Sequence, residues 1–513
     1  MAKKSTQLRF SDTHHPVVLE VNTRVLLHEL SAAAGTAVAL GNLPEELLDE
    51  WSAQGIDGVW LMGVWATGDV GRKLAVEYPG MMEAYRRALP DATPEDVLGS
   101  PYAVQEYRVA AEFGGGIGLR SLRLRLARRG IGLILDYVSN HTARDHKWVK
   151  QHPEYYIHRD PSVDPTPLQG AFSVETSKGM RWVAHGRDPM FPEWEDTAQL
   201  NPKSATARAA MIAQLGKIAG MCDGVRCDMA MLLLTDVFNR TWGDKAHPEP
   251  DDAAAGEFWE EAIETIQKEK PEFIFIAEAY WDRQWDLQQL GFHYTYDKTL
   301  YDRLLREGAM AVRDHLKAEM AYQQRSLRFL ENHDEERAAR VLPSEPWQFA
   351  AATVIGTVPG MLLLHEGQMD GRTVRVPVQL RRRVEEAPNM RVRAFYQELL
   401  NVINHPIFKR GEWSLLSMRA AWHDNHTWQN FLSYWWREPL HGQRLVVINY
   451  APHSGQCYVD LPLDLLEAHH LEFRDLMGSS LYVRERSALQ AKGMYFDLPG
   501  YGLHIFEVAE AHK

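Results

Sequence analysis

Cysteines and long apolar runs are scarce in this sequence, and each shortage excludes a class of protein. The 513 residues include three cysteines, Cys222, Cys227 and Cys457. Three is a small and odd number, so a framework of disulfide bonds is not expected. No run approaches the roughly 18 consecutive apolar residues of a membrane-spanning helix. No apolar segment of a secretory signal follows the first residues. We therefore expect a cytoplasmic protein with reduced thiols and no membrane partner.

A surplus of positive charge is also missing. The formal net charge is −13, from 69 acidic and 56 basic residues, so nucleic acid is not expected as the main partner. Internal repeats and low-complexity segments are absent from the sequence as well. The chain is too long for one simple core, so we expect one large domain and an accessory domain.

Strand-like apolar runs alternate with amphipathic helical patterns about eight times over some 400 residues. This alternation predicts a parallel α/β fold, and eight units favour a (β/α)8 TIM barrel over a doubly wound sheet. We expect a long loop over residues 66–110. The arginines of a helix predicted at about 118–129 are expected to form its solvated outer face.

The pattern of the chain changes twice along its length. Residues 142–204 are polar, aromatic and rich in proline, which predicts a small subdomain inserted after strand 3 of a barrel that spans 1–409. Beyond about 410, short β-type runs separated by Pro, Gly and Ser replace the helical periodicity. Residues 410–513 are therefore predicted to form a C-terminal β-sandwich domain, in which we find no catalytic constellation.

Four of the strand-like runs end in acidic residues. These are Asp136, Asp228, Glu278 and Asp334. Side chains alternate along a strand, so Arg226 and Asp228 point to the same side, and the arginine can hold the aspartate ionised. An isolated pair of this kind is usually structural. Three further acids at the carboxyl ends of strands, where TIM barrels carry their active sites, favour a reaction centre.

These acids suit the cleavage of a glycosidic bond. In the retaining route one carboxylate attacks the sugar and a second carboxyl, about 5 to 5.5 Å away, protonates the leaving oxygen. Asp228 and Glu278 follow neighbouring strands of the predicted barrel. Burial against Tyr280 and Trp281 would raise the pKa of Glu278, as a general acid requires. A divalent cation bound by the same acids is the alternative.

Four short segments resemble, in order, conserved regions of the α-amylase superfamily, glycoside hydrolase family 13. They are 135–141 (LDYVSNH), 224–228 (GVRCD), 277–278 (AE) and 329–334 (FLENHD). The likeness extends to 359–368 and to the terminal β-domain, so it covers nearly the whole chain. One segment alone is a weak signal, whereas four in the same order are specific.

The resemblance implies a role for each matching residue. Asp228 would be the nucleophile, Glu278 the general acid/base, and Asp334 a residue that stabilises the transition state. The remaining positions would contact or orient the reacting sugar, and they are Tyr102, Asp136, His141, Arg226 and His333. The implied protein is a retaining glycoside hydrolase that acts on maltodextrin-like or other α-glucan substrates. The alternatives are a glucosyltransferase or isomerase (trehalose-synthase-like or glucanotransferase) and a catalytically inactive binding protein.

Two positions depart from the family pattern. Met231 and Leu232 stand where many amylases have Lys-His or His after the nucleophile, which puts in doubt contacts beyond the cleavage point and one calcium ligand. Asn140 matches a calcium-ligand position of the family. The resemblance thus implies a structural calcium at most, and no required cofactor.

Overall fold

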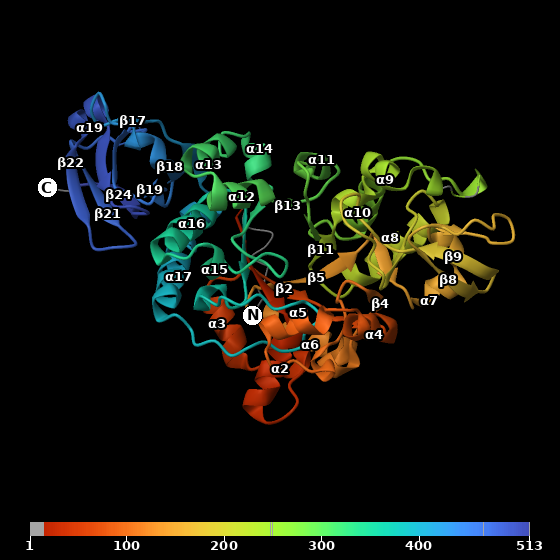
Figure 1. Cartoon of the computed structure of the whole chain (residues 1–513). Coiled ribbons are helices and arrows are strands. Elements are labelled where there is room, and N and C mark those ends of the chain that lie inside the picture. The colour runs from red at the N-terminus through yellow and green to blue at the C-terminus, as the bar shows by residue number, and fades with distance from the viewer. Residues whose placement is uncertain (1–14, 247, 249, 465, 512–513) are drawn as a thin grey trace, which may run out of the picture.

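A closed barrel of eight parallel strands forms the centre of the computed structural model, which describes residues 15–246, 248, 250–464 and 466–511 (Figure 1). The barrel strands are β1 (Val17–Asn22), β2 (Gly58–Met62), β5 (Gly132–Val138), β11 (Gly224–Asp228), β12 (Ile274–Ala277), β13 (Tyr294–Tyr296), β14 (Ser326–Arg328) and β15 (Met361–His365). Strand β15 pairs with β1 and closes the barrel. The predicted (β/α)8 barrel is confirmed.

Side chains of the barrel strands alternate between the barrel interior and the surrounding helical layer. In β1, Val18 packs inside the barrel with Ile134 of β5, whereas Leu19 belongs to the core beneath the helices. Glu20 and Asp136 lie two positions beyond Val18 and Ile134, and both are buried. The interior is therefore apolar at its centre and acidic toward the carboxyl ends of its strands.

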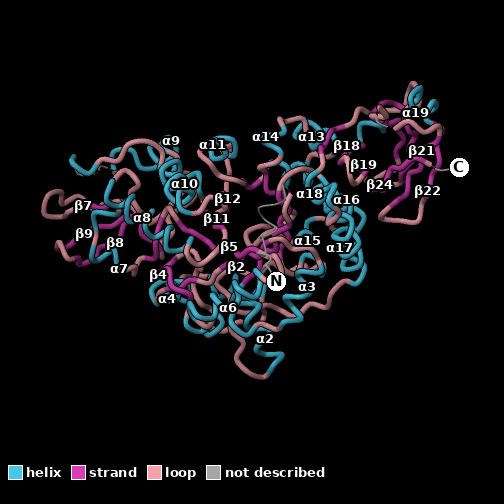
Figure 2. Tube along the Cα trace, turned by 180° about the vertical axis from the view of Figure 1, so that it is seen from behind, coloured by secondary structure: helices cyan, strands magenta, loops and turns pink. Residues whose placement is uncertain are grey.

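Helices cover the outside of the barrel (Figure 2). The longer ones are α2 (Thr23–Ala34), α3 (Glu45–Ala53), α6 (Gly115–Ala127), α8 (Ala205–Ala219), α10 (Phe258–Glu269), α12 (Lys298–Arg306), α16 (Glu345–Thr357) and α17 (Met390–Ile403). Each buries an apolar stripe against the strands, as amphipathic helices do.

The arginines predicted to form a solvated face are solvated only in part: Arg120 and Arg128 are exposed, whereas others form ion pairs. Arg129, just beyond the end of α6 (Gly115–Ala127), contacts Asp49 at 2.6 Å and Glu45 at 2.7 Å, both on α3. Arg123 contacts Asp223, in the turn before β11, at 2.6 Å. Helical spacing shows which side of a helix faces outward, but it does not show that acidic residues of neighbouring elements lie beside that side.

Residues 66–110 are not the long loop that the sequence analysis expects. They include helices α4 (Asp69–Glu77) and α5 (Met81–Ala88) and strand β4 (Val104–Val109), which pairs with β3 (Trp65–Thr67). Helix α5 buries Tyr85 in a small cluster with Leu380, almost 300 positions away in the chain. Such distant packing stabilises short helices whose own sequence pattern is weak.

The insertion after the third barrel strand contains two small antiparallel sheets. One pairs β6 (His141–Ala143) with β10 (Thr197–Gln199), and the other contains β7 (His158–Arg159), β8 (Ala171–Thr176) and β9 (Gly179–Ala184). In Figure 1 this region and the C-terminal sheets lie at opposite ends of the molecule.

The C-terminal region contains a six-stranded and a three-stranded antiparallel sheet. The first comprises β16 (Glu412–Leu415), β18 (Phe431–Glu438), β19 (Gly442–Asn449), β24 (Leu503–Glu510), β21 (His470–Asp475) and β22 (Leu481–Glu485), and the second β17 (Met418–Ala420), β20 (Gly455–Val459) and β23 (Met494–Leu498). Along β18, Tyr434 and Trp436 join the barrel core, whereas Trp435 packs into the core of the C-terminal region itself. The indole of Trp436 donates to the carbonyl of Thr357 on α16 at 2.7 Å.

Throughout the described part of the chain, every helix is too short or too polar to cross a bilayer.

Candidate active site

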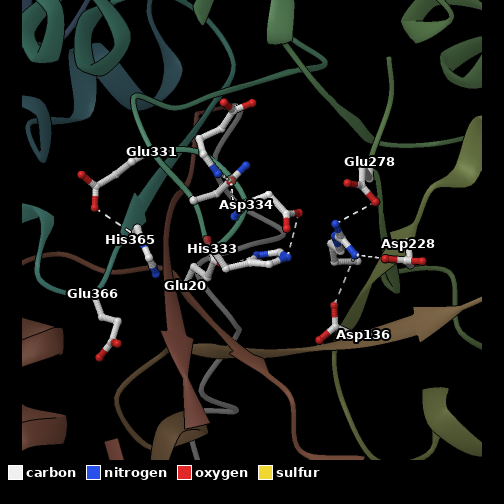
Figure 3. Close-up of polar contacts among 12 residues, drawn as sticks. Glu20, Asp136, Asp228, Glu278, Glu331, His333, Asp334, His365 and Glu366 are labelled. Atoms are coloured by element: carbon white, nitrogen blue, oxygen red, sulfur yellow. Dashed lines mark hydrogen bonds and ion pairs between the residues drawn. The ribbon is translucent and has the colours of Figure 1, made fainter. Parts of the chain in front are cut away.

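The four predicted acids come together at the carboxyl-terminal mouth of the barrel (Figure 3). Asp136 lies in β5 and Asp228 ends β11. Glu278 directly follows β12, and Asp334 lies beyond β14. Because parallel strands end at the same edge, residues far apart in sequence meet there. They form two groups of charges, each organised around one cationic side chain.

The first group, the Arg226 cluster, contains Asp136, Arg226, Asp228 and Glu278. Nη1 of Arg226 lies 2.8 Å from Oδ1 of Asp228 and 3.7 Å from Oδ1 of Asp136, and Nη2 lies 2.8 Å from Oε2 of Glu278. The arginine side chain is 1% exposed. The sequence pattern pairs Arg226 with Asp228 alone, but in the structure one guanidinium contacts all three acids.

Aromatic rings enclose the Arg226 guanidinium. Its carbon lies 5.2 Å from the ring centroids of Trp60 and Tyr102 and 5.6 Å from that of Tyr296. Ring faces attract a cation, and this attraction strengthens where water is excluded. The guanidinium also occupies the space among the acids where a bridging metal ion would have to bind. This arrangement disfavours the alternative of a divalent cation shared by these carboxylates.

Glu278 accepts hydrogen bonds on both carboxyl oxygens. Besides Arg226, the backbone N–H of Met229 donates to Oε2 at 2.6 Å, and the hydroxyl of Tyr280 donates to Oε1 at 3.0 Å. Burial raises the pKa of Glu278 to about 7, against the opposing charge of Arg226. Met229 has a φ of 43°, in the left-handed region that non-glycine residues seldom adopt. This strained turn directs its N–H toward Glu278.

The second group, the His333 cluster, contains Glu20, His333 and Asp334. Nδ1 of His333 lies 2.5 Å from Oε1 of Glu20, and Nε2 lies 3.0 Å from Oδ2 of Asp334. Burial lowers the pKa of His333, but the charges of Asp334 and Glu20 outweigh it and raise the pKa well above its ordinary value. Each ring nitrogen of the resulting imidazolium therefore lies against a carboxylate.

Asp334 is the most open of the three expected catalytic acids. Its side chain is 49% exposed, against 8% for Asp228 and 4% for Glu278. Although burial would raise the pKa of Asp334, the charge of His333 lowers it. The side chain of Asn332 accepts the backbone N–H of Asp334 at 2.9 Å, which fixes the turn after β14.

Tyr102 and His141 line the same mouth. The hydroxyl of Tyr102 lies 2.8 Å from Nε2 of His333, and the two rings stack at 5.3 Å. Burial lowers the pKa of His141, with the charge of Asp228 opposing the shift, so the imidazole is neutral near pH 7. A neutral His141 can share hydrogen bonds with sugar hydroxyls without adding charge beside Asp228.

Asn140, the expected calcium ligand, forms a closed pair with Gln199. Nε2 of Gln199 donates to Oδ1 of Asn140 at 3.0 Å and to its carbonyl at 2.8 Å, while Nδ2 of Asn140 donates to Oε1 of Gln199 at 3.2 Å. Calcium prefers several oxygen ligands, but here an amide N–H₂ faces both oxygens of Asn140. Within the described residues no group of three or more His, Cys, Asp or Glu side chains could hold a metal. These contacts do not fit a calcium ion.

Several residues of the mouth were not expected from the sequence. Glu20 had the clearest signal, because it is a lone charge inside the apolar run 17–21. Trp60 and Tyr296 gave none, since their runs are typical of buried strands. Met229 has no signal in the sequence, because it contacts Glu278 through its backbone N–H and not through its side chain.

A barrel with paired acids at its carboxyl-terminal mouth is the architecture of many glycosidases. A model of the alpha-amylase catalytic domain matches residues 53–394. The chain therefore belongs to the alpha-amylase family, which is the superfamily indicated by its sequence.

Individual relatives are distant. The alpha-amylase MalA of Haloarcula japonica is 26% identical over 255 residues, which cover 48% of this chain and 33% of MalA. The chain thus aligns with only a third of that relative's length. The maltogenic alpha-amylase AmyB of Thermotoga neapolitana superimposes with a TM-score of 0.68 at 19% identity, covering 97% of this chain and 99% of AmyB. Amy13B of Eubacterium rectale gives 0.66 at 14% identity, covering 98% and 96%. These likenesses support the fold.

Proposed function

We propose that the protein is a retaining enzyme that cleaves α-glucosidic bonds through a covalent glycosyl-enzyme intermediate. The observation that carries the proposal is the bridge from Arg226 to Asp228 and Glu278. One guanidinium contacts two carboxyl groups at the ends of neighbouring strands, one proposed as the nucleophile and the other as the general acid. Asp228 lies 2.8 Å from Nη1, and burial favours a proton on Glu278.

Each step of this reaction has a candidate group. Glu278 would give its proton to the glycosidic oxygen while Asp228 attacks the anomeric carbon. The proton belongs on Oε1, because Oε2 already accepts two N–H donors. Glu278, now a carboxylate, would then take a proton from the water that hydrolyses the intermediate.

The His333 cluster would act on the sugar. Asp334 is open to the mouth and would accept hydroxyl groups of the reacting ring, with His333 keeping its carboxylate ionised. Tyr102 supplies a ring face, and aromatic faces stack well on the apolar side of a sugar. These contacts would strengthen as positive charge develops on the ring.

An α-glucan is the substrate class that the comparisons support best. One similar structure is the alpha-amylase of Geobacillus thermoleovorans in complex with acarbose, with a TM-score of 0.64 and 14% identity. Transglycosylation or isomerisation uses the same intermediate, so access of water decides between these outcomes.

The test is product analysis on maltooligosaccharides and α-linked disaccharides. We expect release of reducing sugar, with the α-anomer formed first in an NMR time course, and loss of activity in Asp228→Asn. First formation of the β-anomer would contradict retention. Sugar binding without turnover on the whole panel would instead favour an inactive binding protein.

A further inference from the structure

A second cavity, of about 610 Å³, adjoins the reaction centre at Asp334. Helix α5 and residues 373–379, which follow β15, contribute most of its lining, and Asp334 belongs to it as well. Asp334, whose carboxylate lies in the His333 cluster, therefore belongs both to the mouth and to the lining of this cavity.

The outer wall of the cavity is held in place. The backbone N–H of Leu98 donates to the carbonyl of Gln379 at 2.8 Å. Arg382 contacts Asp96 at 2.6 Å and Asp91 at 2.9 Å. These bonds tie the segment after β15 to the residues after α5, so the cavity exists before a ligand arrives.

Positive side chains predominate around this cavity. Arg87, Arg340 and Arg375 line it, and besides Asp334 its carboxylate is Glu336. Glu336 lies 3.7 Å from Arg375 and 3.8 Å from Arg340, at the outer limit of an ion pair. Arg87 has no ion-pair partner within the described residues. The carboxylate of Asp334 contacts His333, and Arg375 donates to the backbone carbonyl of Asp334 at 2.9 Å. Three arginines of the lining therefore face two carboxylates, one of which is shared with His333.

Two arginines in the segment after β15 are fully paired, in contrast to Arg87. Arg383 contacts Glu29 at 2.6 Å and Glu366 at 2.9 Å, and Arg382 likewise contacts two carboxylates. The whole chain carries a net charge of −13. A local excess of guanidinium groups in such an acidic protein is therefore not a reflection of its composition.

We propose that this arginine-lined cavity binds an acidic group, a phosphate or a carboxylate, carried by the substrate beyond its reacting sugar. Guanidinium groups recognise both anions through paired N–H donors. The inference rests on the proposed function, and it narrows the substrate class from neutral α-glucans to α-glucosides with an anionic part.

The experiment compares substrates that differ by one charge. 2-O-α-D-Glucosylglycerate and 2-O-α-D-glucosylglycerol differ only in a carboxylate against a CH₂OH, and α-D-glucose 1-phosphate tests the phosphate source. At low salt we expect kcat/KM about tenfold higher for the carboxylate than for its neutral partner. The advantage should shrink in 0.5 M NaCl, because salt screens exposed charges.

Variants separate the cavity from general charge effects. The double substitution Arg87→Ala/Arg340→Ala should reduce the preference to about twofold or less. Arg86→Ala is the matched control: it lies next to Arg87 on α5 but does not line the cavity, so the preference should remain. Equal use of charged and neutral substrates by the unmodified protein, or a preference that survives the double substitution, would overturn the proposal.

Binding keeps this question separate from turnover. Calorimetry with Asp228→Asn measures the affinity of both glucosides even if neither is cleaved. A preference for the anion without catalysis by the unmodified protein would support the cavity and contradict the proposed function. Equal affinity for the two glucosides would contradict anion binding in the cavity and would leave the proposed function untouched.

Discussion

The two charge clusters at the barrel mouth differ in the nature of their central cation. The Arg226 cluster is buried and built on a guanidinium that stays charged at every working pH. The His333 cluster is built on an imidazolium, whose charge exists only because two carboxylates support it, and its Asp334 is half exposed. We infer that the first cluster fixes the reacting groups permanently, whereas the second can be modulated by pH and by the ligand.

Of the changes considered for the two clusters, removal of Arg226 should cause the largest loss of stability and activity. In Arg226→Met three buried carboxyl groups lose their cation, so we expect destabilisation of about 3–5 kcal/mol and a fall in kcat of about 10⁴-fold. Denaturant unfolding and steady-state kinetics would measure the two losses.

Arg337→Met is the matched control for that substitution. Arg337 is equally buried and contacts Glu331 at 2.6 Å, but it does not touch the catalytic acids. It should lose comparable stability while the folded fraction keeps most of its activity. If Arg226→Met retained kcat within tenfold of the unmodified protein, the hypothesis that Arg226 organises the reacting carboxyl groups would be wrong.

The pH profile should show the protonation of Glu278. Burial raises the pKa of Glu278 to about 7, and only its protonated form can give a proton to the leaving oxygen. We expect kcat/KM to be level below that pH and to fall about tenfold per unit above it. α-Glucosyl fluoride needs little acid assistance, so its profile should lack this limb. The same limb for both substrates would assign it to another group.

Features that depend on a local stretch of sequence could be predicted, and the structure agrees with them. The barrel and the positions of the acids at its strand ends follow from alternating runs and from segments such as 224–228. The bridge from Arg226 to Glu278 could not be predicted from the sequence, because it depends on the spacing between strands β11 and β12. Helices α4 and α5 were missed for a similar reason, since their stabilising contacts lie hundreds of residues away.

The His333 cluster should respond to loss of Glu20. Glu20 raises the pKa of His333, and the imidazolium is lost as the pH rises through that pKa. Glu20→Gln should lower the pKa of His333, so the variant loses the imidazolium at a lower pH than the unmodified protein. The ratio of variant to unmodified kcat/KM should therefore stay near one at pH 5.5 and fall about tenfold by pH 8. Taking this ratio cancels the Glu278 limb.

Glu29→Gln provides the comparison for this charge change. Glu29 contacts Arg383 outside both clusters, so its substitution should leave the ratio flat. A pH-independent loss in Glu20→Gln would show that Glu20 acts by packing and not through the charge of His333.

Chelation should have the smallest effect, because a cationic side chain stands at the centre of each cluster. The pair of Asn140 and Gln199 satisfies its own amides, so dialysis against EDTA should shift the melting temperature by less than about 1 °C. Gln199→Asp would replace the amide N–H₂ with carboxylate oxygen beside Asn140. That variant should be less stable without calcium and should recover stability as calcium is added. A marked fall in the melting temperature of the unmodified protein with EDTA, reversed by calcium, would show that the amide pair opens to admit the ion. Strand β6, which carries His141, would then depend on a metal, since Gln199 of β10 pairs with His141.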